Sequence, residues 1–130
     1  MNLLLDTHVF LWYITGDERL SEPMRGSIRN SENEVYLSAV SIWEAVVKYQ
    51  LGKLPLPESP ERYLPMQRER HQILSLPLDE ASVSRLAEIP SIHRDPFDRM
   101  LICQAIEHSL TLATVDEQVR AYPVPMLDRT

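Results

Sequence analysis

The sequence predicts an α/β domain with a short, mainly parallel sheet flanked by helices. Short apolar runs typical of buried strands alternate along the chain with longer segments typical of helices. With 130 residues, 44% of them hydrophobic and 25% charged, the composition is ordinary for one globular domain with its own core. Because no repeat, low-complexity segment or linker interrupts it, we expect residues 1–130 to form a single domain.

The first half of the chain is expected to contain two strands and three helices. The first strand is an uninterrupted apolar run that ends at Asp6. The third helix is apolar nearly all round except for a stripe that includes Glu44 and Lys48, and Gly52 follows it as a C-terminal cap would. Strands are expected at 2–6 and 35–37, and helices at 8–13, 22–30 and 41–51.

Prolines and capping residues mark the elements of the second half. Closely spaced prolines at 55, 57 and 60 enforce a loop before the fourth helix. Asp79 is placed to cap the fifth helix, and Pro90 lies beyond its end. Asp95-Pro96 is a strong helix start, since a capping residue precedes a proline at the first helical position. Helices are expected at 61–71, 79–89, 95–109 and 116–121, and strands at 73–76, 111–114 and 124–127.

Four acidic residues stand where apolar segments end or helices begin: Asp6, Glu44, Asp98 and Asp116. The carboxyl ends of parallel strands share one edge of a sheet, where ligand clefts form. Asp6 and Asp116 follow expected strands, and Glu44 and Asp98 lie near the starts of helices that leave this edge. Carboxylates gathered there repel each other and retain protons unless a divalent cation neutralises them. The sequence therefore predicts a metal-binding acidic site.

Each acid also has a purely structural interpretation. Asp6 and Asp116 suit helix N-caps, each worth ~1 kcal/mol. Ser41 and Glu44 match a capping box, and Glu44 with Lys48 suits an i,i+4 ion pair worth ~0.3 kcal/mol. Asp98 complements a helix dipole. Capping does not explain why four negative charges should meet at one edge, so the metal site remains the stronger hypothesis.

Other residues support a site less. His93 and Arg94 suit phosphate binding but also a polar loop before a helix, and Arg99 is spaced to pair with Asp95. Cys103 lies mid-helix among apolar residues and is expected to be a core thiol. The aromatic residues at core-like positions, which do not form a base-stacking platform, are Trp12, Tyr36, Trp43 and Tyr49.

Net charge and cysteine content indicate which ligands and which cellular compartment suit the chain. A net charge of −6 argues mildly against nucleic-acid binding, although a metal would offset the four acids of the expected site. No apolar run approaches the ~20 residues of a membrane span, and the N-terminus lacks the basic region of a signal peptide. The lone cysteine forms no internal disulfide, which fits a reducing cytoplasm.

Four segments carry a resemblance to a known family. They are LLLDTHVFLW, SAVSIWEAVVKYQLGKL, HRDPFDRMLICQA and TLATVDEQVRAY, and they span almost the whole chain. The chain resembles PIN-domain endoribonucleases, specifically the VapC-type toxins of bacterial and archaeal toxin–antitoxin pairs. The resemblance implies a PIN-like three-layer fold. It places the family's metal-binding acids on Asp6, Glu44, Asp98 and Asp116, and a threonine that orients a carboxylate or water on Thr114.

The resemblance further implies metal-dependent cleavage of RNA, a small antitoxin partner and a homodimer. Mg²⁺ suits a site of carboxylates, with Mn²⁺ as the alternative ion. Two other classes stay open: a catalytically silent PIN-like binding module, and a receiver-type phosphoacceptor domain. A receiver would need paired acids after the first strand and a late lysine, but Thr7-His8 follows Asp6 and Lys53 is the last lysine. A haloacid-dehalogenase-type phosphatase would need an aspartate at position 8.

Overall fold

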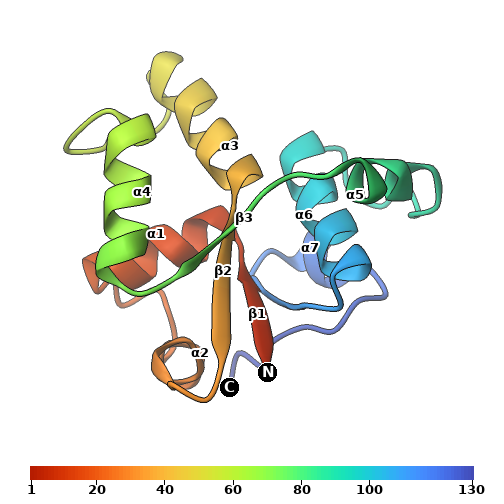
Figure 1. Cartoon of the computed structure of the whole chain (residues 1–130), viewed down its shortest axis with the longest axis horizontal. Coiled ribbons are helices and arrows are strands. Elements are labelled where there is room, and N and C mark those ends of the chain that lie inside the picture. Colours follow the sequence, from red (N-terminus) through yellow and green to blue (C-terminus); the bar gives the residue numbers. More distant parts are fainter.

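The computed structural model describes residues 1–130 (Figure 1). It contains a four-stranded, fully parallel sheet with strand order β3-β2-β1-β4. The strands are β1 (Asn2–Leu5), β2 (Glu34–Ser38), β3 (Leu74–Leu76) and β4 (Thr111–Ala113). The helices are α1 (Thr7–Thr15), α2 (Glu22–Arg29), α3 (Ala39–Gln50), α4 (Pro60–Arg70), α5 (Glu80–Ser84), α6 (Pro96–Glu107) and α7 (Glu117–Arg120), with a 3₁₀ turn, η1 (Arg85–Ala87), after α5. The predicted α/β class is confirmed.

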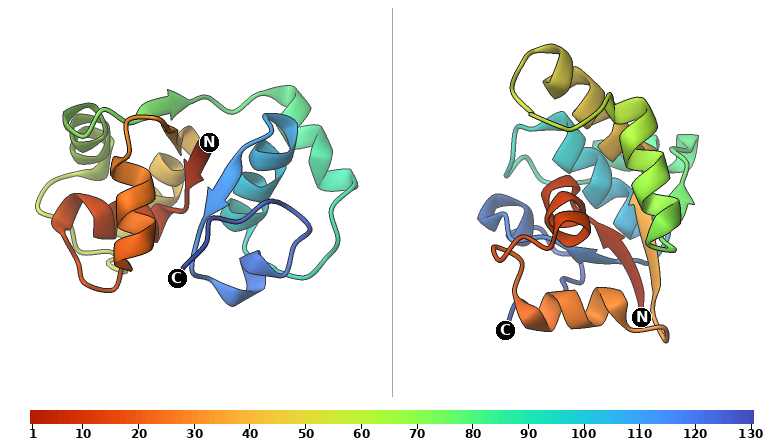
Figure 2. Two further views of the ribbon diagram at one scale, coloured as in Figure 1. Left: turned by 90° about the horizontal axis from the view of Figure 1, so that it is seen from below. Right: turned by 90° about the vertical axis from the view of Figure 1, so that its left-hand side faces the viewer.

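Three layers result from the alternation of side chains along the strands. Leu3 and Leu5 of β1 pack into one apolar cluster with residues of α1, α2 and α4, while Leu4 packs into a second cluster with residues of α6 and α7. Successive side chains of a strand point to opposite faces, so one apolar run fills both cores. Figure 2 shows helices on both sides of the sheet, which confirms the three-layer arrangement.

The topology places a crevice at the carboxyl ends of β1 and β4. From β1 the chain continues to β2 on one side, whereas β4 pairs on the other side of β1. In open parallel sheets, ligands bind at such a reversal of strand order. Asp6 follows β1 directly, and Thr114 follows β4. Helix α3 leaves the same edge and contacts both α4 and α6 (Figure 1).

Helix α3 begins earlier than its sequence predicts. Ser38 is its N-cap, and the Ser38 hydroxyl accepts a hydrogen bond from Val40 N at 2.9 Å. Ser41 is buried inside the helix, and its hydroxyl is hydrogen-bonded to Thr7 Oγ1 at 2.8 Å. The alternative interpretation of Ser41 and Glu44 as a capping box is therefore wrong, because Ser38 is the N-cap and the Ser41 hydroxyl contacts a residue 34 positions away.

Two predicted elements of the second half are also shorter than expected. The helix expected over 79–89 is capped by Asp79 but breaks after Ser84 into a 3₁₀ turn, in a segment rich in serine and valine, which favour helices weakly. The strand expected over 124–127 is a single bridge between Met126 and Leu112. Pro123 and Pro125 lack the N–H groups that a longer ladder requires.

Two aromatic residues expected in the core are exposed. Trp43 is 54% exposed and Tyr49 38% exposed, both on α3. The Trp43 ring stands edge-on to Phe97 of α6, with 4.8 Å between the ring centroids. No helix in the structure is both long enough and apolar enough to span a bilayer.

Candidate metal centre

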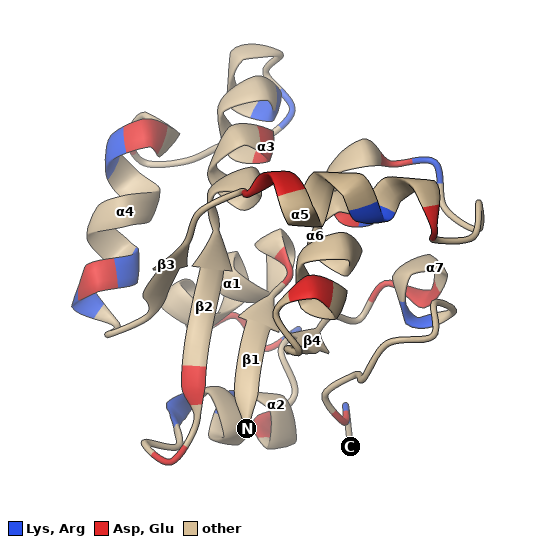
Figure 3. Ribbon diagram, turned by 45° about the vertical axis from the view of Figure 1, so that its right-hand side comes forward, with Lys and Arg blue, Asp and Glu red and all other residues tan.

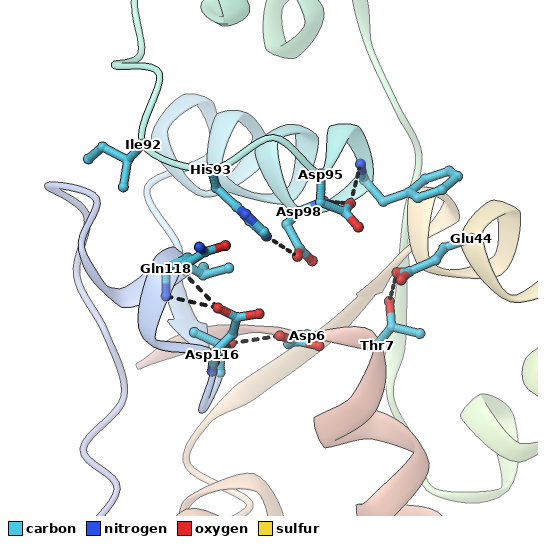
Figure 4. A network of polar contacts seen from close by, with 12 residues as sticks. Asp6, Thr7, Glu44, Ile92, His93, Asp95, Asp98, Asp116 and Gln118 are labelled. Carbon is cyan, nitrogen blue, oxygen red and sulfur yellow. Dashed lines mark hydrogen bonds and ion pairs between the residues drawn. The ribbon is translucent and has the colours of Figure 1, made fainter. Parts of the chain in front are cut away.

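All four predicted acids line one pocket of about 350 Å³ at the carboxyl edge of the sheet. Figure 3 shows acidic positions on α3 and next to α7, on either side of this edge. In Figure 4 the labelled carboxylates of Asp6, Asp98 and Asp116 face a common space, with Glu44 beside them. The remaining lining residues are His8, Trp12, Lys48, His93, Asp95 and Val115. The prediction that the four acids share one edge of the sheet is confirmed.

Asp6 acts as a helix cap and a pocket carboxylate at once. Asp6 Oδ1 accepts a hydrogen bond from His8 N at 2.9 Å, and Asp6 Oδ2 accepts one from Thr114 Oγ1 at 2.6 Å. Burial raises the pKa of Asp6, while the hydrogen bonds from Thr114 and His8 lower it in part and the charge of Glu44 raises it further. The capping interpretation is correct but incomplete, because a cap alone needs no burial in an acidic pocket.

Thr114 connects the two strands that flank the crevice. It is fully buried, donates to Asp6, and accepts a hydrogen bond from Asp116 N at 3.1 Å. Asp116 in turn caps α7, and its Oδ1 accepts a hydrogen bond from Gln118 N at 2.8 Å. The Thr114 hydroxyl thus orients the Asp6 carboxylate, which is the contact that the resemblance implies.

Glu44 is buried on α3 and held by two partners. Its Oε1 accepts a hydrogen bond from Thr7 Oγ1 at 2.7 Å, and its Oε2 forms the predicted i,i+4 ion pair with Lys48. Burial opposes the charge of Lys48, but the hydrogen bond and charge of Glu44 outweigh it, so the pKa of Lys48 is raised. Sequence reasoning did not assign Thr7 to the site, since its contact with Glu44 joins residues 37 positions apart.

Removal of the Thr7 hydroxyl should disturb Glu44 without changing any charge. We expect Thr7→Val to lower stability by ~1–3 kcal/mol, the usual cost of leaving a buried polar group without its partner. Denaturant unfolding of wild type and variant measures this difference. Thr15→Val is the matched control, because the Thr15 hydroxyl is bonded only to carbonyls of its own helix. Equal losses in both variants would contradict a special role for Thr7.

The segment before α6 carries two aspartates with different contacts. Asp95 is the N-cap, and its Oδ1 accepts hydrogen bonds from Phe97 N at 2.9 Å and Asp98 N at 3.0 Å. Asp98 lies in the first turn, and its Oδ2 is 2.8 Å from His93 Nε2. Burial raises the pKa of Asp98 to about 7; the His93 hydrogen bond lowers it, and the charges of Asp6, Asp95 and Glu44 raise it.

His93 lines the pocket, although its sequence context favoured a polar loop over a phosphate ligand. Three potential ligand atoms, one each from His93, Asp98 and Asp116, lie within 4.8 Å of one another. The only sequence signal was the position of His93 two residues before Asp95. The donor set of several carboxylates and one imidazole fits a divalent cation, because the oxygens are hard ligands and the ion's charge offsets theirs.

Two further predictions concern α6. The ion pair expected between Arg99 and Asp95 does not form; only the helical hydrogen bond from Arg99 N to Asp95 O joins them, at 3.0 Å. Arg99 Nε is buried without a hydrogen-bond partner. Cys103 is fully buried, so its prediction as a core thiol is confirmed.

Comparison with known proteins identifies the family. The family model for the PIN domain matches residues 3–125. The chain belongs to the PIN domain family. This match covers every pocket residue described above, so the acidic pocket lies within the matched domain.

Among individual proteins, this PIN domain is similar to two ribonucleases of Mycobacterium tuberculosis. It is 27% identical to ribonuclease VapC22 over 123 residues, which is 95% of this chain and 93% of the relative. It is 39% identical to ribonuclease VapC16 over 57 residues, which is 44% of this chain and 40% of that relative. Among solved structures, VapBC2 from Rickettsia felis bound to a promoter DNA fragment shares the fold, with a TM-score of 0.70 and 16% identity over 98% of each chain.

The raised pKa of Asp98 predicts how the stability of this PIN domain changes with pH. Between about 4 and about 7 the folded Asp98 holds a proton that the unfolded chain has released, so the free energy of unfolding should fall as pH rises. In EDTA at pH 8, Asp98→Asn should therefore raise the melting temperature by about 4 °C, the shift that ~1 kcal/mol produces in a small domain.

Glu44→Gln is the matched comparison for this experiment. It also removes one negative charge, but it breaks the ion pair with Lys48, so its melting temperature should fall. Thermal scans of both variants from pH 5 to 8 decide the matter. If the melting temperature rises in Glu44→Gln but not in Asp98→Asn, the uncompensated negative charge belongs to Glu44 and not to Asp98.

Proposed function

We propose that this PIN domain is a metal-dependent endoribonuclease that hydrolyses RNA phosphodiester bonds and acts as the toxin of a toxin–antitoxin pair. The observation that carries the proposal is the convergence of Asp6, Glu44, Asp98 and Asp116 in one pocket. The similarity to two proteins named as ribonucleases supports RNA as the substrate.

The four acids would hold the cation, Mg²⁺ or alternatively Mn²⁺. Bound there, a divalent ion supplies positive charge for the phosphoryl group and lowers the pKa of water. Thr114 keeps Asp6 oriented, and Thr7 and Lys48 keep Glu44 in place. These buried contacts hold the carboxylates in position before the substrate arrives, which is the arrangement that electrostatic catalysis needs.

Water is the nucleophile in this proposal. No serine, threonine or cysteine is among the residues that line the pocket. A pocket carboxylate that does not bind the cation would accept the proton of the attacking water. In this proposal the chain contributes binding, orientation and proton transfer, and water attacks the phosphorus directly.

We further propose a small antitoxin as partner, a homodimeric assembly and action in the cytoplasm. The solved structures that share the fold include VapBC complexes, which supports a VapB-like partner for this chain. The pocket attracts a guanidinium as it attracts a cation, so a basic antitoxin tail placed there would inhibit cleavage.

RNA cleavage by the purified chain tests the enzymatic proposal. We expect RNA to be cut in Mg²⁺ or Mn²⁺, to stay intact in EDTA, and to be cut again when excess metal is restored. Binding of RNA without cleavage under any metal would identify a silent binding module. Stable incorporation of phosphate from acetyl phosphate at Asp6, without RNA cleavage, would identify a receiver-type domain.

A further inference from the structure

His93 brings an imidazole nitrogen into a cluster otherwise made of carboxylates. Its Nε2 lies 2.8 Å from Asp98 Oδ2, and ligand atoms of His93, Asp98 and Asp116 all lie within 4.8 Å of one another. Two ligands on opposite sides of one ion are about 4.2 Å apart, given bonds of about 2.1 Å. The three atoms are therefore spaced for a single ion with only small side-chain adjustments.

The backbone around His93 is held by a buried tyrosine. Tyr122 Oη accepts hydrogen bonds from His93 N at 2.8 Å and from Ile92 N at 3.2 Å, and Tyr122 itself packs in the core with α6. The His93 side chain is 13% exposed and that of Asp98 15% exposed. Figure 4 shows the imidazole directed from its loop toward Asp98, on the side of the pocket where Asp116 lies.

We propose that His93 Nε2 is a metal ligand, which together with Asp98 and Asp116 forms a mixed nitrogen–oxygen subsite beside the oxygen-only side of Asp6 and Glu44. This proposal rests on the metal dependence proposed above and extends it to the choice of ion. The hydrogen bond between His93 and Asp98 needs one shared proton, and a cation that binds both atoms takes the place of that proton.

A nitrogen ligand changes which ions the pocket prefers. Imidazole adds little affinity for Mg²⁺, which favours oxygen ligands, but it adds affinity for first-row transition ions such as Fe²⁺, Co²⁺ and Zn²⁺. The subsite should therefore bind Co²⁺ more tightly than Mg²⁺, and His93 should account for much of the difference between the two ions.

His8 is the competing imidazole, because it also lines the pocket. It differs from His93 in its surroundings: its side chain is exposed on α1, and its ring lies next to Trp12 with 6.2 Å between the centroids. The pair His93→Gln and His8→Gln therefore forms a matched comparison. Glutamine at position 93 can still donate a hydrogen bond to Asp98, so the folded state retains a partner for that carboxylate.

Mn²⁺ bound to the full-length protein provides a direct readout that needs no RNA. Electron spin echo envelope modulation detects ¹⁴N of an imidazole that coordinates Mn²⁺. We expect this ¹⁴N signal in wild type and in His8→Gln and its loss in His93→Gln. By calorimetry, His93→Gln should weaken Co²⁺ binding by about tenfold or more, since even outer partners of a metal site contribute that much, and should weaken Mg²⁺ binding less.

Three results would overturn the inference: a ¹⁴N signal that persists in His93→Gln, wild-type protein that binds Mn²⁺ without the signal, or wild-type protein that binds no Mn²⁺. These results are separable from failure of the proposed function. If the protein shows the His93-dependent signal but cuts no RNA, the metal subsite is supported and the ribonuclease function is not. If the protein cuts RNA but shows no such signal, the ribonuclease function is supported and the metal subsite is not.

Discussion

Asp98→Asn should reduce RNA cleavage by on the order of 100-fold or more, the upper range for lost metal-site partners, whereas Asp95→Asn should keep substantial activity. Asp98 faces His93 and the pocket, and its charge is needed there. Asp95 Oδ1 accepts hydrogen bonds from the N–H groups of Phe97 and Asp98. Asparagine caps helices as well as aspartate does, so α6 should start unchanged in Asp95→Asn.

Both rates should be measured over a magnesium titration. Excess Mg²⁺ should restore part of any loss in Asp95→Asn, because that variant weakens only the field around the ion. The thermal scans described above exclude misfolding, since Asp98→Asn is expected to be more stable than wild type in EDTA. If Asp95→Asn is the less active enzyme and Mg²⁺ restores neither variant, Asp95 belongs among the metal ligands.

Asp6→Asn should abolish RNA cleavage and growth arrest while leaving the fold intact. Asp6 follows β1, which pairs with β4, and it is buried. Asp6→Asn therefore removes a negative charge that no neighbouring solvent molecule restores. Asparagine can still accept the hydrogen bond from His8 N that caps α1. Circular dichroism should show native helix content in the inactive variant.

Thr114→Val is the matched control for Asp6→Asn. It removes the hydroxyl that orients Asp6 but keeps the carboxylate and its charge. We expect an intermediate loss of cleavage rate, because the ligand remains but its orientation is less fixed. Wild-type cleavage by Asp6→Asn in the presence of Mg²⁺ would contradict the placement of Asp6 at the metal centre. A Thr114→Val variant less active than Asp6→Asn would shift the essential role to the hydroxyl.

The sequence was sufficient to predict the fold class and the shared edge of the four acids, because both depend on local signals. Apolar runs of strand length predicted β1 and β4, and the geometry of parallel sheets placed Asp6 and Asp116 at one edge. Asp95-Pro96 and Asp79 predicted helix starts by capping chemistry that acts within three residues.

Two site residues that were missed depend on contacts between distant residues. The role of Thr7 comes from a cluster that joins α1 to α3 across more than 30 residues. His93 enters the pocket because Tyr122, 29 residues later, holds its backbone. No local pattern encodes such contacts, so His93 looked like an ordinary loop residue.

If the pocket carboxylates act through a cation on water, an RNA with one 2′-deoxynucleotide at the cut site should remain a substrate. Attack by water does not use the 2′-hydroxyl of the substrate. We therefore predict that the modified RNA is cut in Mg²⁺ at a rate close to that of the unmodified RNA, and that neither is cut in EDTA. Loss of cleavage at the modified position, with 2′,3′-cyclic phosphate ends on the unmodified RNA, would show that the 2′-hydroxyl and not water is the nucleophile.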